Sequence, residues 1–167
     1  MKNDDRNDDP FDRSNQKLRD EYYNIRSVLD KTNVENGIDM TGADLGRTSL
    51  AAMRYLKAQE LGNANRLDPD SPIDGASLSK ANPNTGVAAG QYIAFYQGNR
   101  DEYEKLRVQG VPTSELGHPA HLSINEIRGI ETDLQQQKQQ VAMAQEQKQQ
   151  RDRDDPQQNT APRSIFG

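Results

Sequence analysis

Residues 123 to 150 read SINEIRGIETDLQQQKQQVAMAQEQKQQ, and this stretch decides which fold we expect for the chain. Nine of the sixteen residues from Gln135 to Gln150 are glutamine. The apolar residues of the whole 123–150 stretch recur with a heptad-like spacing, which predicts a helix with one narrow apolar stripe. The stripe consists of Ile127, Ile130, Leu134, Val141 and Ala144, and Gln137 stands where a further apolar residue is expected. A helix this polar buries little surface alone, so we expect it to need a partner.

The start of this helix carries its own signal. Ser123 and Glu126 have the spacing of a capping box, in which each side chain bonds a free backbone N–H group of the first turn. A helix from 123 to 150 would be about 42 Å long at 1.5 Å per residue. Because the stripe is too narrow to bury the whole helix, we expect this segment to protrude from the rest of the chain or to pack on a neighbour.

Three further helices are predicted upstream. Residues 13–31 contain apolar residues at helical spacing, namely Leu18, Tyr22, Ile25 and Leu29. A helix over 42–61 is framed by Thr41, a favoured N-cap residue, and by Gly62, a favoured C-terminal stop. Residues 85–109 present Ala88, Tyr92, Phe95 and Tyr96, which we interpret as a third helical region: one helix kinked at Gly98-Asn99, or two short helices. Residues 63–84, rich in proline and aspartate, are predicted to be a long connection.

Together these patterns predict an all-α fold of about four helices with long loops. We expect an acidic polar tail over 1–12 and a small helical domain over 13–122. The long polar amphipathic helix follows over 123–150, with a flexible tail over 151–167. The hydrophobic fraction is 32%, well below the roughly 45–50% (glycine included) of ordinary globular chains, so we expect only a small core.

Composition excludes several classes of protein. The chain has no cysteine, which removes disulfides, thiolate zinc sites and cysteine nucleophiles. It contains no apolar run of the roughly 18 residues that a membrane helix requires, so we expect no membrane insertion. The net charge of −5 is spread along the chain and forms no basic stripe, which argues against general nucleic-acid binding. We therefore expect a cytoplasmic protein, or one incorporated into a large assembly such as a virion.

Two groups of polar residues are candidate metal ligands. His118 and His121 share one loop with Glu115, but chance loop histidines explain this spacing more simply than a zinc site does. Asp68, Asp70 and Asp74 superficially resemble a calcium-binding loop. The loop pattern fails at Pro72, Ile73 and Ser79, and turns capped by aspartate explain the same residues. We accordingly predict no metal, no cofactor and no catalytic residue.

Apolar residues within the polar tails are candidate anchors. Phe11 follows the acidic N-terminal segment, and Ile165 and Phe166 are the large apolar residues near the C-terminus. Tails of this kind can act as docking motifs that fold on binding. The predicted protein-interaction residues are therefore Ile127, Ile130, Leu134, Val141, Phe11, Ile165 and Phe166.

These traits favour a non-enzymatic adaptor or structural subunit of a multiprotein assembly, such as a virion or a secretion or conjugation apparatus. Its partners would be proteins, with a second copy of the chain among the candidates, contacted through coiled-coil-like helix and tail surfaces. The alternative is a soluble regulatory binding protein, such as a chaperone or an inhibitor of a nucleic-acid enzyme. The mass of the protein in solution separates the two hypotheses, because a repeated structural subunit self-assembles or copurifies at a fixed multiple stoichiometry.

Overall fold

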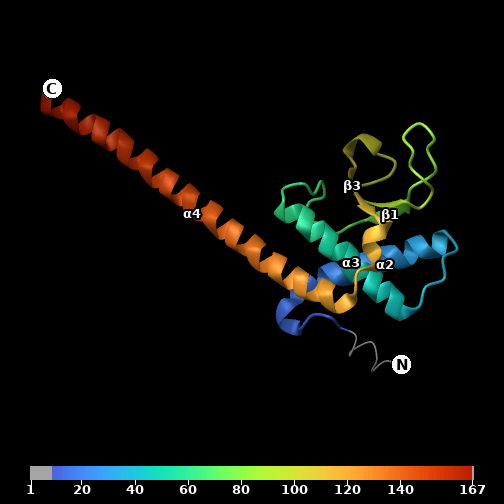
Figure 1. The fold of residues 1–167 in the computed structure, drawn as a ribbon. Coiled ribbons are helices and arrows are strands. Elements are labelled where there is room, and N and C mark those ends of the chain that lie inside the picture. The colour runs from blue at the N-terminus through green and yellow to red at the C-terminus, as the bar shows by residue number, and fades with distance from the viewer. Residues whose placement is uncertain (1–8, 167) are drawn as a thin grey trace. The chain divides into compact units, whose positions relative to one another are not determined.

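The computed structural model describes the backbone of residues 9–166 and the side chains of residues 9–153. The chain divides into a compact unit that ends at Ile130 and a second unit that begins at Glu131. Within the described residues the compact unit contains two long helices, a small sheet, three short 3₁₀ turns and the first turns of a last helix (Figure 1).

Helices α2 (Gln16–Glu35) and α3 (Gly42–Leu61) follow the predicted pattern closely. A 3₁₀ turn, η1 (Arg13–Asn15), precedes α2, whose buried face includes Leu18, Tyr22, Ile25 and Leu29. The Thr41 side chain accepts a hydrogen bond from the backbone N–H of Asp44 at 3.1 Å, which confirms the predicted N-cap of α3. The same helix stops at Gly62, as its sequence predicts.

A three-stranded antiparallel sheet accompanies the helices, with the order β1-β2-β3. Its strands are β1 (Gly75–Leu78), β2 (Tyr92–Gln97) and β3 (Arg107–Pro112). Ala76 lies opposite Phe95 in the first pair of strands, and Ile93 lies opposite Val111 in the second. Two further 3₁₀ turns, η2 (Tyr103–Lys105) and η3 (Thr113–Gly117), flank β3.

The prediction of an all-α fold is therefore wrong, and the fold is mixed α and β. The error lies in residues 85–109, where the expected helical region is replaced by β2, η2 and the first half of β3. Burial along β2 alternates strictly, with Ile93, Phe95 and Gln97 inward, which is the period of a strand rather than of a helix. Gly90 and Gly98 have φ angles of 72° and 111°, values that a helix interior does not allow. Part of the predicted 63–84 connection also forms a strand, β1.

The core joins the inner face of the sheet to the helix pair. Phe95 is fully buried, and Met53 of α3 is 1% exposed. Residues of α2, α3 and all three strands belong to one hydrophobic cluster, which also contains Phe11 and Ile127. The small size of this cluster agrees with the low apolar content of the chain.

The last helix, α4, spans Ala120–Phe166 and so differs from the predicted helix at both ends. It begins before Ser123, whose backbone N–H donates to the carbonyl of Pro119 at 3.0 Å as an interior helical residue does. Ser123 is therefore a buried helix residue rather than an N-cap. Pro119, which immediately precedes α4, has no N–H group that needs a partner. The helix continues past Gln150, through the region expected to be a flexible tail; residues 1–8 of the expected acidic tail lie outside the described residues.

Gly75 of β1 provides a test of the sheet. A Cβ atom there would overlap the ring of Tyr96, its partner on β2, whereas a Cβ at Gly110 of β3 would meet nothing within 4 Å. We expect Gly75→Ala to lower the free energy of unfolding by about 1–3 kcal/mol, since overpacking forces neighbours out of place. Gly110→Ala is the matched control and should be neutral or slightly stabilising. Urea denaturation measures both, and equal effects of the two variants would contradict the observed register.

Candidate functional site

The residues of the predicted interaction stripe on α4 differ in burial. Ile127 is fully buried within the core of the compact unit, Leu134 is 4% exposed, and Ile130 is half-buried. Val141 is 57% exposed and is thus the one large apolar member of the predicted stripe that is open to solvent.

The predicted anchors outside α4's stripe have different environments. Phe11 is 2% exposed, and its ring meets the ring of Tyr22 edge-on at a centroid distance of 6.4 Å. Phe11 thus fastens the start of the described chain to α2. The side chains of Ile165 and Phe166 lie outside the described residues.

From Gln135 to Arg153 the helix is exposed on every side. Each described side chain from Gln135 to Arg153 is exposed, and these include Val141 and Met143, the latter at 59%. With Ala142 and Ala144, these two residues form an apolar collar around the helix rather than a single stripe. We call residues 135–153 the exposed segment of α4; its glutamine amides can both donate and accept hydrogen bonds.

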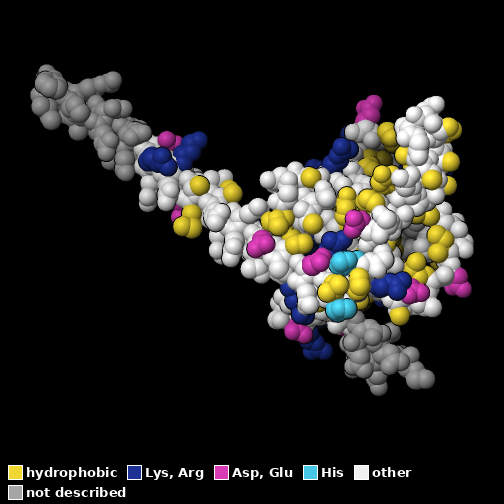
Figure 2. Space-filling model, in the orientation of Figure 1, with side chains coloured by type: hydrophobic (Ala, Val, Ile, Leu, Met, Phe, Trp, Pro, Cys, Tyr) yellow, Lys and Arg dark blue, Asp and Glu magenta, His cyan; other side chains and the backbone are white. Residues whose placement is uncertain are grey.

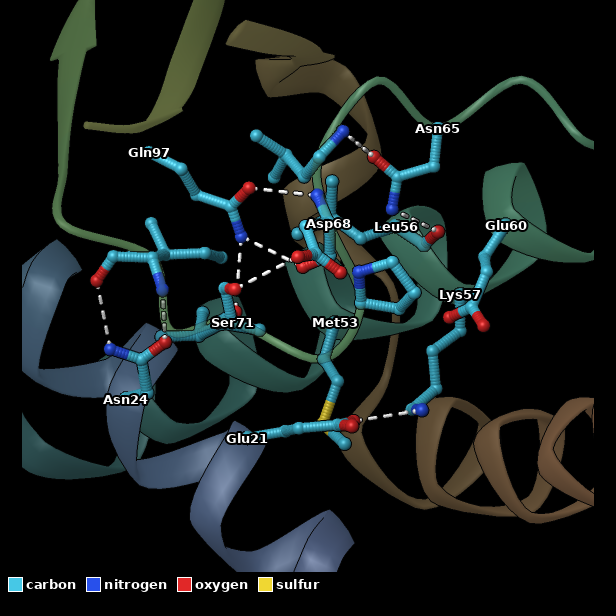
Figure 3. A pocket seen from close by; sticks show the side chains of 14 residues that line it. Glu21, Asn24, Met53, Leu56, Lys57, Glu60, Asn65, Asp68, Ser71 and Gln97 are labelled. Atoms are coloured by element: carbon cyan, nitrogen blue, oxygen red, sulfur yellow. Dashed lines mark hydrogen bonds and ion pairs between the residues drawn. The ribbon is translucent and has the colours of Figure 1, made fainter. Parts of the chain in front are cut away.

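The compact unit contains a small pocket between α2, α3 and the 65–73 segment (Figure 3). Its volume is about 60 Å³, enough for a few water molecules but below the roughly 300 Å³ of typical small-molecule sites. Lys57, which is 4% exposed, lines it and forms an ion pair with Glu21 at 2.8 Å. Burial of the Lys57 ammonium carries a desolvation cost, which the Glu21 carboxylate partly offsets.

Side-chain amides in the same pocket bond to the backbone of the long connection. The Gln97 amide donates to the carbonyls of Asp68 and Ser71 at 2.8 and 3.0 Å, and its oxygen accepts from the N–H of Asp68 at 2.7 Å. On α2, Asn24 donates to the carbonyl of Ile73 and accepts from its N–H, at 3.0 and 2.8 Å. The polar lining of this pocket therefore holds the connection in place.

Asp68 caps a turn in this connection. Its carboxylate accepts hydrogen bonds from the N–H of Asp70 at 3.0 Å and from the hydroxyl of Ser71 at 2.9 Å, and Arg107 lies 3.4 Å away. These interactions lower the pKa of Asp68 below its ordinary value of 3.8, with the Asp70 N–H as the largest cause. The carboxylate of Asp74 instead accepts from the N–H of Gly98 at 2.7 Å. Asp68 thus caps a turn, whereas Asp74 bonds the residue that follows β2.

The two histidines lie close together on one face of the compact unit, with apolar side chains between them (Figure 2). His118 faces Glu126, with 3.3 Å between Nε2 and Oε1. Arg54 of α3 forms ion pairs with both Glu115 and Glu126, at 2.7 and 3.3 Å, so Glu115 is already engaged. Over the range that the structure describes, no three His, Asp or Glu side chains converge in a way that could hold a metal ion.

Comparisons with known proteins give no relative: no protein-family model, curated protein or solved structure matches the chain. Over the described residues, none of the helices has the length and apolarity needed to cross a membrane.

Sequence reasoning missed the polar residues that organise the compact unit. Arg54, Lys57 and Gln97 lie in elements that the sequence marks only by their apolar residues. Their polar partners are far along the chain, so no local pattern predicts these contacts. A weak signal existed for Gln97 alone, because it completes the inward alternation of Ile93 and Phe95 once the segment is recognised as a strand.

We expect Gln97→Met to lower the free energy of unfolding by about 1–3 kcal/mol, because it leaves backbone groups of Asp68 and Ser71 without partners. Gln59→Met, on α3, is the control, since the Gln59 side chain makes none of these bonds. Chemical denaturation gives both values. If Gln97→Met were as stable as the control, the amide contacts would not hold the connection.

Titration of Asp68 provides a test by pH. Because its folded pKa is lowered, its stabilising contribution is complete above the unfolded value near 3.8 and is lost as the pH falls through the folded pKa. Carbon-detected NMR of the carboxyl group should place the midpoint below 3.8, and Ser71→Ala should move it upward. Ser114→Ala, which lies outside this turn, should leave it unchanged. A midpoint at or above 3.8 in the wild type would contradict the cap.

Proposed function

We propose that the chain is a non-enzymatic adaptor or structural subunit of a multiprotein assembly, such as a virion or a secretion or conjugation apparatus. The exposed segment of α4 is its principal protein contact. The observation that carries this proposal is the exposure of every described side chain from Gln135 to Arg153, with Val141 and Met143 at 57% and 59%.

The physical support comes from what stabilises helices. Isolated helices are marginal in water, and most helical stability in proteins comes from packing an apolar face. The part of α4 that belongs to the second unit, residues 131–166, would extend about 50 Å at 1.5 Å per residue. An assembly partner that covers Val141 and Met143 would supply the packing that this segment lacks in the isolated chain.

Glutamine suits such a contact. Its amide both donates and accepts hydrogen bonds without carrying charge, so it pairs with varied polar neighbours and avoids the desolvation cost of an ion. Met143 adds an unbranched, polarizable side chain that fills irregular gaps at an interface. The segment therefore combines adaptable polar contacts with a small apolar centre.

The test replaces the apolar centre with charge. Full burial of Val141 and Met143 would contribute about 1.5–3 kcal/mol each, so Val141→Asp with Met143→Asp should weaken association more than tenfold. The matched control, Val34→Asp with Tyr103→Asp, introduces the same charge at two exposed apolar positions outside this segment and should retain association. Sedimentation equilibrium measures the mass of each protein against the 18.8 kDa of one chain.

The thermal midpoint of the double variant should match the wild type, because both side chains are already exposed. A wild-type chain that remains monomeric and copurifies with no stoichiometric partner would contradict the proposal. A monomer or dimer that binds one defined target would favour a regulatory binding protein instead.

A further inference from the structure

The compact unit contains a second and larger cleft, of about 510 Å³, whose role is separate from the proposed assembly contact. It lies between α2, the first turns of α3, the first turns of α4 and the Asp9–Pro10 segment. This volume falls within the roughly 300–1,000 Å³ typical of small-molecule sites. Its apolar wall includes Leu50 and Ile124, and its polar wall includes His121 and Asn125.

Three arginines line this cleft, one from each helix: Arg26 of α2, Arg47 of α3 and Arg128 of α4. Arg26 is half-buried, and its Nη1 donates to the hydroxyl of Tyr22 at 2.9 Å. Among the described residues, the Arg26 guanidinium pairs with no carboxylate. A guanidinium stays charged at any relevant pH, so its cationic edge is available to an anion.

Two carboxylates near the cleft form ion pairs with arginines, and one of these arginines, Arg47, lines the cleft itself. Asp9, which lines the cleft, forms an ion pair with Arg19 at 2.9 Å. On α3, Asp44 pairs with Arg47 at 3.2 Å. Arg128 donates to the carbonyl of Pro10 at 3.5 Å, which holds its side chain at the rim. Of the described residues that line the cleft, three are arginines and one, Asp9, is a carboxylate.

Two glycines of α3 leave room for the Arg26 guanidinium. A Cβ atom at Gly46 would lie 3.0 Å from Nη1 of Arg26, and one at Gly42 would lie 3.6 Å from its Nη2. The guanidinium thus lies across the glycines in the first turns of α3. Gly42 and Ala43, at the start of α3, and Ala120, at the start of α4, also line the cleft. The first N–H groups of a helix have no acceptor within it, and helix N-termini favour anions.

We propose that this cleft binds a phosphomonoester that carries a small apolar or aromatic body. A phosphomonoester has three terminal oxygens and nearly two negative charges, which suits several guanidinium groups and backbone N–H donors at once. A carboxylate, with two oxygens, is satisfied by the fork of one arginine. Leu50 and Ile124 provide the surface on which the apolar body packs.

The test uses the full chain with phenyl phosphate as the probe and inorganic phosphate as the comparison, each titrated calorimetrically at low salt. We expect saturable binding of phenyl phosphate that is tighter than that of inorganic phosphate. Arg26→Gln should weaken it about tenfold, because a charge-assisted fork is lost. Arg66→Gln, the same substitution outside the cleft, should leave it unchanged.

A second variant keeps the Arg26 charge but changes its position. Gly46→Ala should displace the Arg26 guanidinium and also weaken binding, whereas Gly129→Ala, where a Cβ meets nothing within 4 Å, should not. This pair keeps the test decisive if Arg26→Gln fails to fold. The proposal is overturned if the wild type shows no saturable binding up to about 10 mM, or if the Gly46 variant binds as tightly as the Gly129 control. Equal affinity for phenyl phosphate and inorganic phosphate would also overturn it.

Discussion

Burial of the inner face of β2 against the helix pair is the contact on which the rest of the compact unit depends. Phe95 and Ile93 project from this strand into the cluster that includes Met53 of α3 and Ile25 of α2. Because β2 is the central strand, its position also fixes β1 and β3 through their pairing. No second hydrophobic core is found in the described part of the chain, so this contact has no substitute there.

The scarcity of apolar residues explains why side-chain amides are prominent in the connection between α3 and β1. Gln97 and Asn24 satisfy backbone groups that a short turn or a further strand would otherwise have to pair. Buried backbone groups nearly always have partners. In this protein, side-chain amides supply these partners at several points. Polar residues therefore stabilise the connection between α3 and β1, which has few apolar residues to bury.

The sequence predicted α2 and α3 well because their signals are local. Thr41 and Gly62 frame α3 at both ends, and the observed bounds match the predicted ones. The strands were missed because Tyr92, Phe95 and Tyr96 fit a helical spacing as well as a strand, and only pairing with distant segments decides between them. Gly90 and Gly98 carried a signal for a turn, through their freedom to adopt positive φ, but glycine alone does not reveal its φ angle.

The candidate sites were predictable to different degrees. The exposure of Val141 follows from the thinning of the apolar stripe, whereas the burial of Leu134 does not. The cleft lined by Arg26 depends on helices that are distant in sequence, and the spacing of Gly42 and Gly46 was its one local hint. A close approach at such a glycine pair can be expected from sequence, but the identity of the approaching side chain cannot.

Met143 has a chemical consequence for the exposed segment of α4. An exposed thioether is open to oxidants, which convert it to a polar sulfoxide. The apolar collar around Val141 would then lose half of its large side chains without any change in sequence. Shielding by a partner would protect the sulfur, so an assembled copy of the protein would be more resistant to oxidation than a free one, and oxidative damage would fall mainly on copies that have no partner.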